Sequence, residues 1–135
     1  MEQEQKLKTL ESVLEAVSES VGDITPIVLD NFFAQYPDAR ELFNEKRLEQ
    51  MMVDQALYCA MVWFKRPMEV KILLRETICH HHGVFKVPAA FFSGLFKSLL
   101  DVLIAETVVE NNAAREVLAE LQSGLLLMVQ QAEVG

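Results

Sequence analysis

The chain has 135 residues, enough for one domain with a substantial buried core. Hydrophobic residues make up 51% of it and charged residues 24%, which is typical of a globular rather than a disordered protein. The net charge of −8 argues against a surface that neutralises nucleic-acid phosphates. No uncharged apolar run reaches the roughly 18 residues of a membrane span, so we expect neither nucleic acid nor membrane as a partner.

The two cysteines, Cys59 and Cys79, lie in predicted helices and form no CxxC motif. We therefore expect two reduced, buried thiols in a cytoplasmic protein. The polar, charged start of the chain, residues 1–8, does not resemble a signal peptide. Because no repeat, linker or low-complexity tract divides the sequence, we expect residues 1–135 to form a single domain.

Apolar residues recur at helical spacing along the whole chain, and strand signals are nearly absent. The predicted helices run over about 4–21, from the Asp23–Pro26 turn to 36, then 38–43, 47–65, 68–82, 88–106 and from Asn111 or Asn112 onward. About seven helices with short connections do not suit a simple bundle. The prediction is an all-α fold whose helices pack in crossed layers.

Two blocks of sequence carry a more specific signal. The first, Asn31–Phe43, reads NFFAQYPDARELF and ends on a phenylalanine; the second begins with the histidine run His80–His82. After His82 come Phe92, ten residues on, and Leu99-Leu100. In this order the blocks resemble bacterial single-domain haemoglobins and the globin domain of flavohaemoglobins. The resemblance covers the whole chain and implies a globin-like fold.

The resemblance also implies a cofactor, haem b (iron protoporphyrin IX), and a reversibly bound diatomic gas such as oxygen. His82 would be the iron ligand, Phe43 would stack on the haem, and Val87 would cover its edge. The proximal side would include Phe92. Storage, delivery or sensing of the gas is the expected role rather than catalysis. Any dioxygenase or peroxidase activity would need an external reductase, since no reductase domain is expected after Gly135.

The residue chemistry around His82 fits this interpretation. An iron porphyrin needs a neutral imidazole, a hydrogen-bond acceptor that orients it, and a dry apolar slot. Leu74 and Ile78 share a helical face with His82, and the Ile78 carbonyl lies one turn back. Spacing to Phe92 favours His82, whereas the longer turn of vertebrate-type globins would favour His81. We expect His80 at a solvated helix end.

The opposite, distal wall is left open by the sequence. Leu29 stands where many bacterial globins have a tyrosine that hydrogen-bonds the gas. The next helix offers three candidates for the distal residue. Gln50 is favoured by the local sequence Leu48-Glu49-Gln50, Met51 by the apolar stripe of the helix, and Val53 by its spacing back from His82.

A glutamine donor at position 50 would suit a bound gas, but it would also bring Asp54 into the pocket. Burying that carboxylate without a partner costs several kcal/mol. We therefore predict Val53 and Leu57 as the distal pair, with Gln50 or Gln55 at the rim.

Some features depart from the family pattern. The stretch from Phe43 to His82 is a few residues short, and Phe92 replaces a tyrosine of the proximal hydrogen-bond network. The missing phenol disfavours peroxidase-like or nitric-oxide dioxygenase chemistry. The short stretch, together with the apolar distal wall, motivates an alternative, a haem-free globin fold that acts as a signalling or interaction module. A metal-dependent enzyme built on Cys79 and His82 is a third reading, but no second ligand cluster completes the four ligands it would need.

Overall fold

The computed structural model describes the backbone of residues 2–42, 45–85, 89–107 and 111–134, with side chains except at 42, 79–85, 89 and 133–134. Within these ranges the chain forms seven helices and no strand, which confirms the predicted all-α class. The helices are α1 (Gln3–Val21), α2 (Thr25–Gln35), α3 (Ala39–Leu42), α4 (Lys46–Val62), α5 (Pro67–Phe85), α6 (Ala89–Glu106) and α7 (Asn112–Val134).

Local chemistry accounts for several helix ends. Gly22 ends α1 with φ at 81°, a left-handed conformation that glycine adopts without steric cost. The carboxylate of Asp23 accepts the first amide of α2, from Thr25, at 3.0 Å. At the start of α7 the side chain of Asn111 accepts the amide of Ala114 at 3.1 Å. The sequence placed the Asp23–Pro26 turn and Asn111 or Asn112 at these two helix starts, and the structure agrees.

The fifth helix is longer than predicted. It was expected to end at His82, before Gly83, but α5 continues to Phe85. A single glycine lowers helix propensity by only about 1 kcal/mol and does not by itself end a helix. The stronger signal is Pro88, which disfavours helical geometry at the residue before it.

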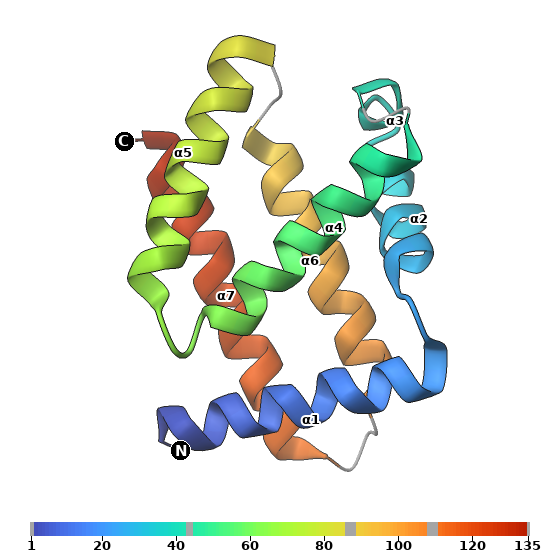
Figure 1. Ribbon diagram of the computed structural model, residues 1–135, viewed down its shortest axis with the longest axis vertical. Helices are drawn as coiled ribbons and strands as arrows, with labels where there is room; N and C mark the ends of the chain where they lie inside the picture. The colour runs from blue at the N-terminus through green and yellow to red at the C-terminus, as the bar shows by residue number, and fades with distance from the viewer. Residues whose placement is uncertain (1, 43–44, 86–88, 108–110, 135) are drawn as a thin grey trace.

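The helices cross one another in layers (Figure 1). The most extensive packing joins α6 to α7, α7 to α5, and α6 to α2. In Figure 1 the first helix crosses the lower part of the molecule, and α4 runs diagonally in front of α6 and α7. From the bend at Pro67, α4 and α5 diverge, so that the two helices form a V that opens upward in this view.

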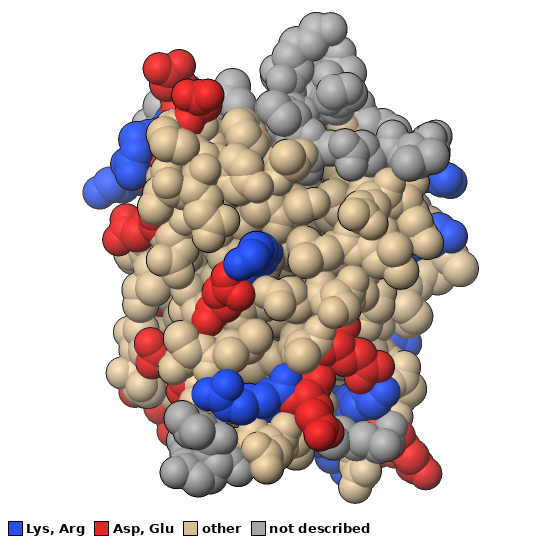
Figure 2. All heavy atoms as spheres, turned by 180° about the vertical axis from the view of Figure 1, so that it is seen from behind, with Lys and Arg blue, Asp and Glu red and all other residues tan. Residues whose placement is uncertain are grey.

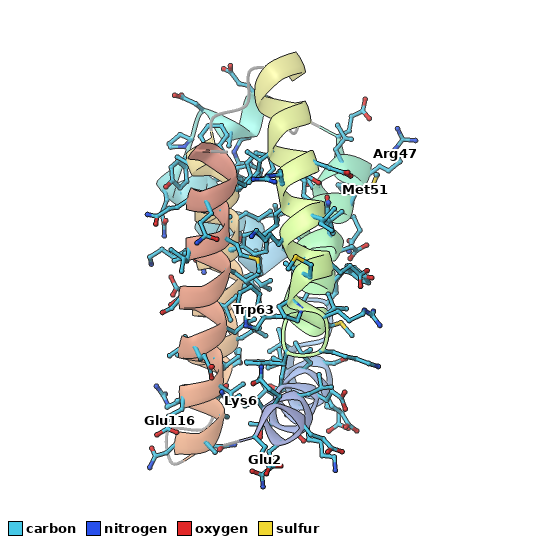
Figure 3. All side chains as sticks on the ribbon, turned by 90° about the vertical axis from the view of Figure 1, so that its left-hand side faces the viewer. Glu2, Lys6, Arg47, Met51, Trp63 and Glu116 are labelled. Carbon is cyan, nitrogen blue, oxygen red and sulfur yellow. The ribbon has the colours of Figure 1, made fainter. Side chains whose placement is uncertain are left out.

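Two glycines allow close contacts between distant helices. A Cβ added to Gly94 of α6 would lie 2.3 Å from the ring of Tyr36, and one added to Gly124 of α7 would lie 2.3 Å from the ring of Trp63. Trp63 projects into the gap between α7 and α5 (Figure 3), so this half-buried side chain belongs to the packing of the domain.

The core is continuous and mostly aliphatic, and it includes the stripes that the sequence predicted. On α5 the buried residues Val70, Leu74 and Ile78 follow one another at four-residue spacing. The largest fully buried side chains are Phe32, Leu10, Leu99, Leu100, Leu103, Leu118, Leu121, Leu125, Val28, Val53, Val70 and Val117. Among the described residues, no helix has the length and apolar character that crossing a bilayer requires.

Candidate functional site

An apolar cavity lies inside the V between α4 and α5, with the first half of α6 behind it. Its volume is about 60 Å³. The lining residues are Met52, Gln55, Ala56 and Cys59 from α4, Leu74 and Thr77 from α5, and Phe91, Phe92, Leu95 and Phe96 from α6. Nearly all of these surfaces are carbon or sulfur, which makes the cavity suited to an apolar ligand rather than a charged one.

A hydrogen bond joins the two arms of the V at the cavity. The side-chain amide of Gln55 on α4 donates to the hydroxyl of Thr77 on α5 at 3.2 Å. Both side chains are partly exposed, so the bond lies at the edge of the cavity. A ligand wide enough to separate α4 from α5 would have to break this bond or move around it.

The only thiol whose side chain is described lies in the cavity wall. Cys59 is buried and free, as predicted. Removal from water raises its pKa to about 11, and the negative charge of Glu69 adds to this effect. A thiol with so high a pKa stays protonated at neutral pH and is a poor nucleophile and metal ligand.

Polar side chains hold the closed end of the V near Pro67. The hydroxyl of Tyr58 on α4 donates to the carboxylate of Glu69 on α5, which also pairs with Arg66. These two hydrogen bonds lower the pKa of Glu69, while the carboxylate raises the pKa of Tyr58. The arms are therefore tied together at the bend, and Gln55–Thr77 is the next link outward.

The predicted proximal residues divide into three groups. Leu74 and Phe92 line the cavity. Ile78 is buried but does not line the cavity. Val87 and Phe43 lie outside the described residues.

The predicted distal residues Val53 and Leu57 do not line the cavity between α4 and α5. Val53 is fully buried without lining it, and Leu57 faces a separate hollow between α1, α4 and α6. The face of α4 that lines the cavity is instead Met52, Gln55, Ala56 and Cys59, rotated by one residue from the predicted pair.

Leu29 and Gln50 come together in another hollow, of about 400 Å³, between α2, α3 and the start of α4. There the amide of Gln50 donates to Thr25 at 3.1 Å and to Asp54 at 2.9 Å. Asp54 stays exposed, so its carboxylate is not buried without a partner. This hollow is lined by acidic and basic side chains and is chemically unlike the cavity.

The histidines stand on α5 one to two turns beyond the cavity wall. The α5 backbone is continuous through positions 80–82, but the side chains there, with that of Cys79, are outside the described part. Position 81 follows Leu74 and Thr77 at spacings of seven and four, whereas position 82 follows Ile78 and Leu74 at four and eight. Thr77 lines the cavity and Ile78 does not. The face of α5 that borders the cavity therefore includes position 81 rather than position 82.

Other metal sites find no support in the described part of the chain, where no group of three or more His, Cys, Asp or Glu side chains is placed to hold an ion. Histidines 80–82 and Cys79 are outside that search.

The residues around the cavity suit a porphyrin in chemistry, but the cavity is small. About 60 Å³ accommodates a few water molecules, whereas cofactor pockets measure several hundred Å³. Half-buried side chains that can move, Met52 and Phe92 among them, form part of the wall. Taking up a haem would therefore require the arms of the V to separate.

Comparison with protein-family models, with curated proteins and with solved structures found no match to this chain.

Proposed function

We propose that this protein is a haem-binding globin that reversibly binds a diatomic gas. The observation that carries the proposal is the apolar cavity between α4 and α5, because the three histidines lie on α5 a few residues after Leu74 and Thr77 of the cavity wall. An apolar slot beside an imidazole is the environment that haem iron requires.

The helix arrangement supports the same proposal. Globins pack their helices in pairs at large crossing angles around the haem. Here α4 crosses α6 and α7 diagonally, α1 crosses the lower part of the molecule, and the cavity lies where α4, α5 and α6 meet (Figure 1).

In this proposal Leu74 and Phe92 exclude water from the faces of the cofactor, and a histidine of α5 holds it through one ring nitrogen. Bound haem supplies an iron centre that takes up the gas. Gln55 offers an amide donor from the cavity wall once its bond to Thr77 opens. Gln55 would thus take the rim position for which both Gln50 and Gln55 were considered from the sequence.

The iron ligand is one of two neighbouring histidines, and two arguments favour different ones. Spacing to Phe92 favours His82, as predicted from the sequence. The phase of α5 favours His81, because position 81 continues the face of Leu74 and Thr77. The two positions differ by about 100° around the helix, so the two assignments are distinct and can be separated by substitution.

Single substitutions separate these assignments. We expect purified wild-type protein, expressed with ample haem, to show a Soret band. Either His82→Ala or His81→Ala should abolish the band, while the other, like His80→Ala, should retain it. Retention of an unchanged band in all three variants would refute iron ligation by this histidine run.

A haem-free interaction module is the second candidate, and the small cavity is the observation that favours it. A globin fold that has given up haem would have its slot filled by side chains, and about 60 Å³ is close to that condition. A protein that stays colourless with abundant haem, and whose absorption is unchanged on titration with haemin, would support this function instead.

A further inference from the structure

The chain's charge is distributed unevenly. From Ala89 to Ala105 on α6, and over residues 121–132 of α7, the only charged residues are Lys97 and Asp101. All of the net charge of −8 therefore lies outside these two segments. Figure 2 shows the side of the molecule opposite to that of Figure 1, where one basic and one acidic side chain lie together within a broad uncharged surface.

The two charges are fixed at the centre of the outward side of α6. The ammonium of Lys97 lies 2.8 Å from the carboxylate of Asp101. Ala90, Ser93 and Ile104 extend this outward stripe at spacings of three and four residues, and none of them is fully buried. From α7, Gln122 donates to the other oxygen of Asp101 at 3.1 Å, which holds the carboxylate in place.

We propose that this α6–α7 face binds a second copy of the chain about a two-fold axis. The axis would pass near the middle of α6, so that Lys97 of each copy meets Asp101 of the other. A two-fold contact needs a self-complementary patch, in which residue i meets residue j and j meets i. An ion pair that lies along one helix provides such a patch, because a second copy turned about the two-fold axis brings each charge opposite its counterpart.

Charge and size favour a second copy as the occupant. Two molecules of net charge −8 repel each other when acidic surfaces meet, but this face contributes no net charge. A standard interface covers about 800 Å² per partner, roughly a tenth of the 7892 Å² surface of this chain. Leu126 is half-buried and follows Gln122 by one turn of α7, so it provides apolar area next to the ion pair.

Charge reversal tests the proposal by sedimentation equilibrium of the full chain. We expect wild type to be a dimer and both Lys97→Asp and Asp101→Lys to weaken it about a hundredfold, because each places like charges opposite one another. Mixing the two variants should restore association as a heterodimer, since every contact is then between opposite charges. The double variant Lys97→Asp/Asp101→Lys should also dimerise.

The exposed pair Glu4–Lys8 on α1 provides matched controls, because it has the same four-residue spacing. Lys8→Asp and Glu4→Lys change the net charge equally and should leave the dimer intact, and circular dichroism checks that every variant is folded. A monomeric wild type would overturn the proposal and leave the face for another occupant. So would a dimer that survives both reversals, or reversed variants that stay monomeric when mixed.

Discussion

The two sides of this molecule are packed differently. Where α6 meets α7 and α2, fully buried side chains such as Leu99 fill the space, and Gly94 lets the ring of Tyr36 lie against the α6 backbone. Where α4 meets α5, the arms diverge around a cavity, and Gln55–Thr77 is the hydrogen bond between them at its edge.

The difference indicates that one side of the molecule is rigid and the other can change its shape. Close packing of α6 with α7 and α2 provides a rigid base, since a packed core resists any change of volume. The V can widen at lower cost, because fewer buried contacts are lost when its arms move apart. In the proposed function a planar ligand would enter on the α4–α5 side, and the proposed dimer face would stay unchanged.

The largest effect should come from comparing equal truncations on the two sides. Leu99→Ala should cost about 3–5 kcal/mol of unfolding free energy, because the packed base cannot collapse around the new cavity. Leu74→Ala, in the cavity wall, should cost about 2–3 kcal/mol, since space already exists beside it. Urea denaturation of both variants measures this, and equal losses would contradict the contrast between the two sides.

Replacing Gly94 or Gly124 by alanine should cause the next largest change in the free energy of unfolding. At an ordinary helical position Gly→Ala stabilises by about 0.5–1 kcal/mol. Gly94→Ala and Gly124→Ala should instead destabilise by about 1–3 kcal/mol, because each new Cβ would overlap an aromatic ring. Ser123→Ala, exposed and next to Gly124, is the control and should be neutral or stabilising. A rise in thermal midpoint for both glycine variants would show that the rings move aside freely.

Helix boundaries were largely predictable because local chemistry sets them. Gly22, Asp23 and Asn111 act within one turn of the ends they define, and the sequence was sufficient to identify them. The end of α5 was predicted three residues early, at His82, because Gly83 was taken as a helix end although Pro88 is the stronger signal. The close contacts of Gly94 and Gly124 depend on partners far away in the chain, which no local pattern reveals.

The face of α4 that lines the cavity is difficult to identify from the sequence. This helix packs against α2 and α6 as well as lining the cavity, so it is buried on more than one side and its apolar stripe does not identify a single face. Val53 is fully buried, as an aliphatic stripe suggests, yet the cavity wall includes the less apolar Gln55 and Thr77. Only the three-dimensional packing distinguishes these faces.

Loss of the bond across the V should have a smaller effect. Gln55→Ala should lower stability by less than about 1 kcal/mol, because the bond is partly solvated. Amide hydrogen exchange in α5 should nevertheless accelerate, with α6 and α7 unaffected. Gln122→Ala, which removes a similar bond between α7 and α6, is the matched control and should leave α5 unchanged. Unchanged exchange in both variants would indicate that Gln55 does not restrain the V.

The smallest effect concerns Cys59 and alkaline pH. Its pKa is raised from 9.0 to about 11, so the folded state favours the neutral thiol. This contribution to stability is fully present below pH 9 and is lost as the pH rises toward 11. Wild type should therefore lose stability more steeply than Cys59→Ala over this interval, as measured by thermal midpoints. Parallel curves would mean that the thiol titrates alike in the folded and unfolded chain.

The most direct test of the proposed function is an absorption spectrum of the reduced protein, expressed with ample haem, before and after carbon monoxide is added. We predict a Soret band that shifts when the gas is added, since haem held by a histidine of α5 would supply an iron centre that takes up the gas. A protein that stays colourless and does not take up haemin, even when Gln55→Ala has removed the bond across the V, would contradict the proposal.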